Sequence, residues 1–137
     1  MKIYFAGSIR GGGSDSKLYK QIILHLKKYG TVIGGEHADK KILSTTDDKS
    51  VNDQFIYNRD RKRLDEADVL VAEVTTPSLG VGYEIGVSVK SKKRVLCLFR
   101  QINGKKLSAM IAGSPDITID EYKNLDEAKK KIDEFFK

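Results

Sequence analysis

The chain has 137 residues, of which 39% are hydrophobic and 32% charged, and its formal net charge is +6. This length and balance predict a single folded domain over residues 1–137, with one hydrophobic core. No apolar stretch approaches the roughly 18 residues that a membrane span needs, so we expect no membrane partner. The single cysteine, Cys97, lies in an apolar run. It excludes a disulfide framework within the chain and predicts a buried thiol in a cytoplasmic protein.

The positive charge is spread over the chain in short clusters. Pairs and triplets of basic residues fall on predicted helix faces or at element ends, mostly with acidic residues nearby. A nucleic-acid surface would combine a concentrated basic stripe with exposed aromatic residues. We therefore expect no nucleic-acid partner, whereas the overall positive field favours small anionic ligands.

Strands and helices alternate from the start of the chain. Residues 2–6 predict a strand, and Ser14 is a candidate cap for a helix over residues 15–29. Thr31–Ile33 predicts a short second strand. Residues 34–50 are polar and irregular, and a connection of that length predicts a flap over a site.

The second half of the chain continues this alternation. A predicted helix over about residues 52–67 precedes a strand at residues 69–74, which reads as apolar on both faces, as central parallel strands are. The later predicted elements are a helix over about 81–91, a strand at 95–99, a short helix over 107–112, a strand at 117–119 and a helix over Leu125–Phe136. This order predicts an α/β fold with a doubly wound, five-stranded parallel sheet flanked by helices.

Two turns hold most of the chemically informative residues. Residues 75–86 follow a buried strand and place Glu84 beside Gly80 and Gly82, at the sheet edge where open α/β folds bind ligands. Residues 7–13 supply backbone N–H groups, a hydroxyl, a guanidinium and a helix start, a combination that suits phosphate. Neither turn is a P-loop or a clean G-x-G-x-x-G, so a dinucleotide is not favoured. A glycine-rich connection without a ligand is the alternative.

Two carboxylates are candidates for nucleophilic or acid–base chemistry. Glu84 is expected in a first helical turn, where the dipole favours the ionised form; an ordinary first-turn glutamate is the alternative. Asp60 falls on an apolar helix stripe, which is costly for an acid unless it pairs with Arg59 or Arg63. A separation of about 5–5.5 Å would suit a covalent glycosyl-enzyme, and a wider one direct attack by water. The pair beside two glycine-rich turns suggests glycosyl chemistry on a small anionic substrate.

Three further side chains are weaker candidates. Tyr4, in the first strand, is placed to orient a carboxylate, with core packing as the alternative. His25 lies on a polar helix face and is expected to be solvated, and His37 is a weak candidate for a base or phosphate contact. The histidines and the cysteine lack the spacing of metal ligands, so we expect no metal and no cofactor.

Six segments make the chain resemble the 2′-deoxynucleoside 5′-phosphate N-hydrolases, relatives of the nucleoside 2-deoxyribosyltransferases. They are YFAGSIRGG (4–12), ADV (67–69), AEVT (72–75), PSLGVGYE (77–84), LCLFR (96–100) and LSAMI (107–111). The resemblance covers most of the chain and implies a flavodoxin-like domain that works as a homodimer. It also implies cleavage of the N-glycosidic bond of a 2′-deoxynucleoside 5′-monophosphate, giving free base and 2-deoxyribose 5-phosphate.

The resemblance also implies roles for individual residues. Glu84 matches the family nucleophile, which forms a deoxyribosyl-enzyme, and Asp60 matches the acid that assists departure of the base. Tyr4 matches the tyrosine that positions the nucleophile, and Ser108 matches a serine donated across the dimer interface. The residues that match the phosphate site are Ser8, Ile9, Arg10, Gly11, Ser78 and Gly80.

Two other functions compete with this hypothesis. A deoxyribosyltransferase acting on unphosphorylated nucleosides usually carries an acid near the position of Ser78, and such an acid would repel phosphate where a serine donates to it. A non-catalytic nucleotide-binding module would keep both turns without needing Glu84, Asp60 and Tyr4 together. The monophosphate hydrolase is therefore the leading prediction.

Overall fold

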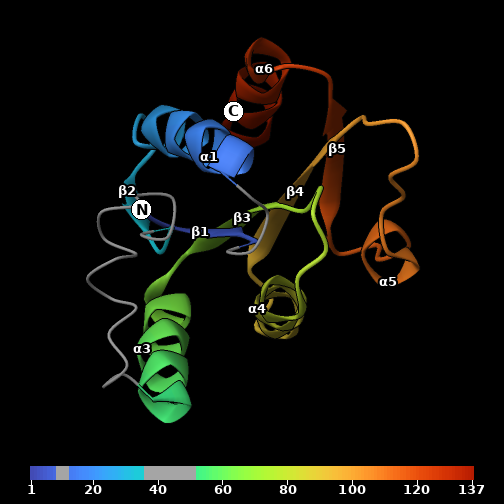
Figure 1. The fold of residues 1–137 in the computed structure, drawn as a ribbon. Helices are drawn as coiled ribbons and strands as arrows, with labels where there is room; N and C mark the ends of the chain where they lie inside the picture. Colours follow the sequence, from blue (N-terminus) through green and yellow to red (C-terminus); the bar gives the residue numbers. More distant parts are fainter. Residues whose placement is uncertain (9–12, 36–51) are drawn as a thin grey trace.

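A five-stranded, all-parallel sheet with the strand order β2-β1-β3-β4-β5 forms the centre of the molecule (Figure 1). The computed structural model describes residues 1–8, 13–35 and 52–137. The strands are β1 (Lys2–Gly7), β2 (Thr31–Ile33), β3 (Val69–Glu73), β4 (Arg94–Arg100) and β5 (Thr118–Tyr122). This order is the doubly wound, flavodoxin-like one, in which ligands bind where the winding direction reverses, here at β1 and β3. The predicted fold class is confirmed.

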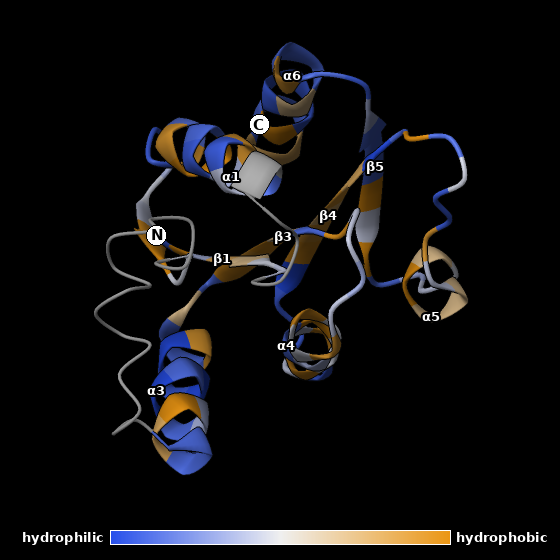
Figure 2. Cartoon of the chain, in the orientation of Figure 1, coloured by the Kyte–Doolittle hydropathy of each residue, from blue (hydrophilic) through white to orange (hydrophobic). Residues whose placement is uncertain are grey.

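Helices cover both faces of the sheet (Figure 1). On one face, α1 (Gly13–Leu26) and α6 (Leu125–Phe136) pack on a core that includes Phe5 and Leu96. On the other face, α3 (Asp53–Glu66) and α4 (Leu79–Lys90) pack on a core that includes Leu70. The short helix α5 (Ala109–Ala112) lies beyond α4. Figure 2 shows that the central strands carry mostly hydrophobic residues, as expected for strands buried on both faces.

The first helix differs from the prediction at both ends. It begins at Gly13, so Ser14 lies inside it and is not its cap. It ends at Leu26, and the amides of Lys28 and Tyr29 then bond to carbonyls three residues back, with Tyr29 donating to Leu26 at 2.9 Å. The turn then passes so close to the chain start that a Cβ on Gly30 would lie 2.3 Å from the Met1 carbonyl oxygen. Only glycine fits there without a shift of the backbone.

His25 is not solvated as its place in the helix predicts. Its side chain is buried under α6, where Nε2 lies 2.7 Å from Asp133 Oδ1. The hydroxyl of Tyr29 donates to the same carboxylate oxygen, and this hydrogen bond lowers the pKa of Asp133, as does His25. The polar face of α1 is therefore partly an interface with the last helix, which no local pattern in α1 reveals.

Several other helix and strand boundaries differ from those predicted, and one strand is less apolar than predicted. Strand β3 ends at Glu73, whose buried carboxyl makes the strand less apolar than predicted. Strand β5 runs on to Tyr122, paired with Arg100 of β4. Helix α4 starts two residues early, at Leu79. In the described part of the chain, no helix is both long and apolar enough to cross a bilayer. The predicted flap, residues 34–50, lies outside the described residues apart from Gly34 and Gly35.

Candidate active site

Glu84 lies in the second turn of α4, not in the first as the sequence predicts. Ser78 is the N-cap, and its Oγ accepts a hydrogen bond from the Val81 amide at 3.3 Å. Starting the helix at Leu79 places Glu84 one turn inside, beyond the free N–H groups at the helix end. Its carboxylate instead accepts a hydrogen bond from the side chain of Tyr4, a buried residue of β1.

This position reverses the expected effect on ionisation. Burial raises the pKa of Glu84 to about 7; the hydrogen bond from Tyr4 opposes the rise, and the nearby charge of Asp60 adds to it. The helix dipole falls off within the first turn, so it does not hold the carboxylate ionised as expected. A carboxyl with its pKa near neutrality is a frequent property of catalytic groups, although structural groups also have it.

Asp60 faces the same region from α3. It pairs with Arg59, with Nε to Oδ1 at 3.0 Å, and with Arg63 one turn away at 3.8 Å. The pairing with arginines that the sequence offered as the alternative is therefore present. It does not remove Asp60 from the site, because Asp60 lines the same cavity as Glu84 and raises the pKa of that residue. Two carboxylates and a tyrosine from three separate elements thus converge.

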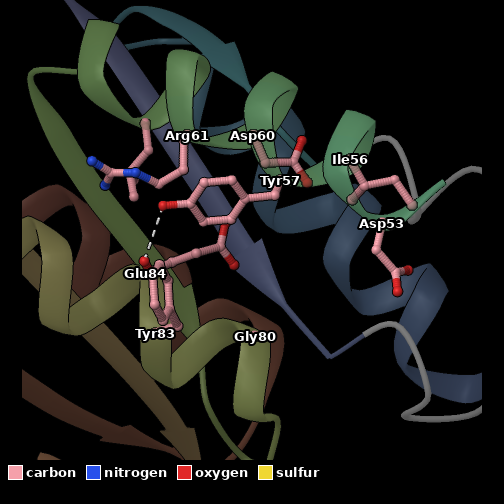
Figure 3. A pocket seen from close by; sticks show the side chains of 9 residues that line it. Asp53, Ile56, Tyr57, Asp60, Arg61, Gly80, Tyr83 and Glu84 are labelled. Carbon is pink, nitrogen blue, oxygen red and sulfur yellow. Dashed lines mark hydrogen bonds between the residues drawn. The ribbon is translucent and has the colours of Figure 1, made fainter.

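A cavity of about 250 Å³ lies between α3 and α4. Figure 3 shows its side chains reaching in from both helices, and the lining residues are Asp53, Ile56, Tyr57, Asp60, Arg61, Leu64, Gly80, Tyr83 and Glu84. Small-molecule sites have this character, a concave and mostly apolar wall with a few polar groups. The cavity is large enough for part of a nucleotide-sized ligand, and such a ligand would lie against the carboxylates that line the wall.

Two tyrosines in this wall were missed by the sequence interpretation. The hydroxyl oxygens of Tyr57 and Tyr83 are 3.2 Å apart, and their rings meet edge to face with centroids 6.1 Å apart (Figure 3). Both side chains are about half exposed. Their spacing held a signal, because Tyr57 is one helical turn before Asp60 and Tyr83 directly precedes Glu84.

The residues expected to bind phosphate are divided between several places. Ser8 follows β1 and is buried, and Gly80 lines the Glu84 cavity. Ser78 and Ser108 line a neighbouring cavity of about 510 Å³ between α4 and the segment that leads into α5. The other three candidates, Ile9, Arg10 and Gly11, lie outside the described residues, as does His37.

The neighbouring cavity has an unusually apolar rim. Leu79 is 96% exposed and Met110 is 83% exposed, and both line this cavity. Ser108 caps α5, with its Oγ accepting from the Met110 amide at 3.3 Å. Large apolar side chains gathered around a cavity frequently mark an interaction surface. Within one chain, Ser108 is not among the residues that line the Glu84 cavity.

The described residues contain no cluster of three or more histidine, cysteine or acidic side chains arranged to hold a metal ion. Cys97 is a free, buried thiol in β4, and burial raises its pKa to about 12. It lies in the core on the α4 side of the sheet, packed among apolar residues. The carboxylates of Glu84 and Asp60, which both line the cavity, are groups suited to acid–base and nucleophilic chemistry.

Comparisons with known proteins give a consistent result. The family model for nucleoside 2-deoxyribosyltransferase matches residues 3–127. A 5-hydroxymethyl-dUMP N-hydrolase from Danio rerio is 47% identical over 139 residues, 99% of this chain and 96% of that protein. The protein of the same name from Tetraodon nigroviridis is 45% identical over 140 residues, 99% of this chain and 97% of that protein.

A solved structure is similar in fold. The CMP N-glycosidase of Clostridium botulinum superposes with a TM-score of 0.72 at 19% identity, covering 97% of this chain and 98% of that one. The family resemblance stated from the sequence is confirmed by the family model and by relatives that match over nearly the whole chain. The chain belongs to the nucleoside 2-deoxyribosyltransferase family.

Proposed function

We propose that this protein hydrolyses the N-glycosidic bond of 2′-deoxynucleoside 5′-monophosphates, releasing the free base and 2-deoxyribose 5-phosphate. The observation that carries the proposal is one cavity lined by both Glu84 and Asp60, with Glu84 hydrogen-bonded to Tyr4, in a chain of this family. Relatives named as 5-hydroxymethyl-dUMP N-hydrolases, similar over nearly their whole length, support the same bond and substrate class.

In the proposed mechanism, a carboxylate oxygen of Glu84 attacks C1′ of the deoxyribose. The bond from C1′ to the base nitrogen breaks, and the base leaves with the bonding electron pair and takes a proton from Asp60. Water then attacks C1′, displaces Glu84 and returns a proton to Asp60, in the double displacement typical of retaining glycosidases. A carboxylate in a partly dry cavity also stabilises the positive charge that develops on the sugar.

Tyr4 has a positioning part in this scheme. Its hydrogen bond fixes the Glu84 carboxylate against β1 and favours the ionised form that attack requires. Because Tyr4 belongs to a central strand and is 4% exposed, it provides a rigid support for the nucleophile.

The 5′-phosphate is proposed to bind at the turns that hold Ser8 and Ser78, with Ile9, Arg10, Gly11 and Gly80 completing the site. Ser78 supports this over a transferase acting on unphosphorylated nucleosides, because an acid at the start of α4 would repel the phosphate. A serine hydroxyl there donates, and the N-terminal end of α4 adds a favourable dipole for an anion.

The test is a panel of deoxynucleoside and ribonucleoside monophosphates, including 5-hydroxymethyl-dUMP, together with the matching nucleosides. Losing several hydrogen bonds to a charged group, each worth about 1.5–3 kcal/mol, predicts far slower cleavage of nucleosides than of monophosphates. Free base is quantified with and without a second base as acceptor. Equal turnover of nucleoside and monophosphate would overturn the proposed substrate, and a new nucleoside formed with the acceptor base would identify a transferase.

We further propose a homodimer in which Ser108 completes the phosphate site of the partner subunit. The exposed Leu79 and Met110 beside Ser108 support a surface that a second copy covers. Ser108 lies outside the Glu84 cavity of its own chain and shares a cavity with Ser78, so a direct test must distinguish a contribution across a two-fold axis from one within the chain.

Mixing two inactive or impaired variants tests this arrangement. Ser108→Ala is expected to raise KM for monophosphates, and Glu84→Gln to abolish turnover. In a heterodimer of the two, one site has both Glu84 and the partner's serine intact, so about half of the heterodimer sites should recover the original KM. If the subunits exchange and no such site appears, Ser108 acts within its own chain.

The compartment is a separate proposal. The lone cysteine, present as a free thiol buried in the core, suits the reducing cytoplasm. Cell fractionation with an antibody against the protein tests this, and recovery in an oxidising compartment would contradict it.

A further inference from the structure

A buried polar cluster lies at the carboxyl edge of the sheet, on the face opposite Glu84. It consists of Asp15 and Tyr19 of α1, Glu73 at the end of β3, Arg100 at the end of β4 and Tyr122 at the end of β5. Tyr19 and Tyr122 belong to the core under α1 and α6. Because the cluster is on the other side of the sheet from the Glu84 cavity, it is not part of the carboxylate chemistry already described.

Glu73 fixes the start of the turn that leads to Ser78. Its carboxylate is 1% exposed and accepts from the Thr75 amide at 2.6 Å, the Thr75 hydroxyl at 3.1 Å and the Tyr122 hydroxyl at 2.7 Å. Burial raises its pKa despite these three donors. The Thr75 hydroxyl also accepts from the Arg100 amide at 2.8 Å, so the turn is held by residues at the ends of β4 and β5.

Asp15 and Arg100 connect this turn to α1. The Arg100 guanidinium donates from Nη2 to Asp15 Oδ1 at 2.9 Å, and the Thr76 hydroxyl donates to Asp15 Oδ2 at 3.3 Å. Asp15 is 5% exposed and lies in the first turn of α1. One carboxylate therefore joins the first turn of α1, the end of β4 and the segment two residues before Ser78.

The cluster also reaches Ser8. The Tyr19 ring packs against Gly7, directly before Ser8, where an added Cβ would lie 2.8 Å from Tyr19 Cε2. The pKa of Tyr19 is raised by burial and by the charges of Glu73 and Asp15, and the Ser8 backbone opposes this rise. The cluster thus contacts the segment after β1 through Tyr19, and the segment after β3 through Thr75 and Thr76. Those two segments hold Ser8 and Ser78, at opposite ends of the same network.

Stability alone does not account for such a cluster. The carboxylates of Asp15 and Glu73 are buried, whereas the Arg100 side chain is only partly so. The desolvation cost of buried carboxylates frequently exceeds the attraction gained from a cation, and apolar replacements are often more stable. A network of several hydrogen bonds does specify one arrangement of the segments that it joins.

We propose that Arg100 and Asp15 are positioning residues that hold the Ser8 and Ser78 turns at the separation the 5′-phosphate requires. This inference rests on the proposed function, since it assigns the two turns to one phosphate group. The residues act through the turns and do not touch the reacting atoms.

The test compares Arg100→Met, Arg100→Lys and Thr75→Val with Lys93→Met as a matched control. Lys93 precedes the same strand at its opposite end, where Nζ donates to the carbonyls of Leu64, Asp65 and Ala67 and fastens α3. All are made in the Glu84→Gln background, so that ligands bind without turnover. Calorimetry measures Kd for the best monophosphate of the panel and for its nucleoside.

Arg100→Met and Thr75→Val should weaken monophosphate binding about tenfold or more, the effect of losing one charge-assisted hydrogen bond. Nucleoside binding should change less than about twofold. Arg100→Lys should recover part of the loss. Thr75→Val removes no charge, so a loss of binding in this variant cannot come from a change in the long-range electrostatic field. This variant also keeps the test valid if Arg100→Met fails to fold. Lys93→Met should lower Tm and leave the ratio of the two Kd values unchanged.

The outcomes separate the two proposals. If the Glu84→Gln parent binds the nucleoside as tightly as it binds the monophosphate, the proposed substrate is wrong. If the parent does discriminate, but Thr75→Val and the Arg100 variants weaken both ligands equally or neither, the cluster is structural only and the positioning inference is overturned.

Discussion

Replacing Glu84 with glutamine tests how strongly burial controls the proposed nucleophile. Burial raises the pKa of this carboxyl from 4.5 to about 7, with the hydrogen bond from Tyr4 acting in the opposite direction and the charge of Asp60 in the same one. Each unit of pKa corresponds to about 1.4 kcal/mol, so keeping Glu84 ionised costs the folded protein about 3 kcal/mol.

The dependence on pH follows from where the proton is bound. Between pH 4.5 and about 7, the folded protein keeps the proton on Glu84 while the unfolded chain loses it, so stability declines as the pH rises through this range. Glutamine has no proton to lose. Glu84→Gln should therefore lie within about 1 kcal/mol of the original chain at about pH 5 and be more stable by roughly 3 kcal/mol at about pH 8, without turnover.

Urea unfolding at one protein concentration, repeated at both pH values, measures this difference. Glu121→Gln is the matched control, because this exposed glutamate of β5 lies away from the cavity. It measures how the loss of one exposed carboxyl changes stability at each pH. If the stability difference for Glu84→Gln varies with pH no more than that of this control, the burial argument fails, whatever the activity shows.

Two further predictions concern the reaction itself. If Glu84 attacks as a carboxylate, as proposed, kcat/KM for an activated base that leaves without a proton from Asp60 should increase as the pH rises through about 7, and a flat profile between about pH 5 and 8 would contradict that role. Asp60→Asn should slow cleavage of poor leaving bases by about 10²–10⁴-fold and activated bases much less. Steady-state rates on both substrate types measure this, and equal losses would assign Asp60 to positioning.

Local patterns were sufficient for most of the fold. The last helix was predicted with its observed bounds, Leu125–Phe136, and its structure depends on close neighbours, with Asn124 as the N-cap. Asn124 Oδ1 accepts from the Glu127 amide at 3.0 Å, a cap that needs no other part of the molecule. The boundaries that moved depend on partners distant in the chain. Strand β5 reaches Tyr122 because β4 continues beside it to Arg100.

For the candidate site too, some features follow from local sequence and others from contacts between distant segments. The order of residues was enough to predict which turns and helices hold the carboxylates, glycines and hydroxyls. The packing of distant segments, by contrast, buries Glu84 against Tyr4, buries the acid Glu73 fully, and places Asp60 and Tyr57 in one cavity with Glu84. Helix periodicity and capping depend on residues within a few positions, whereas ionisation and cavity shape depend on which distant segments exclude water from a side chain.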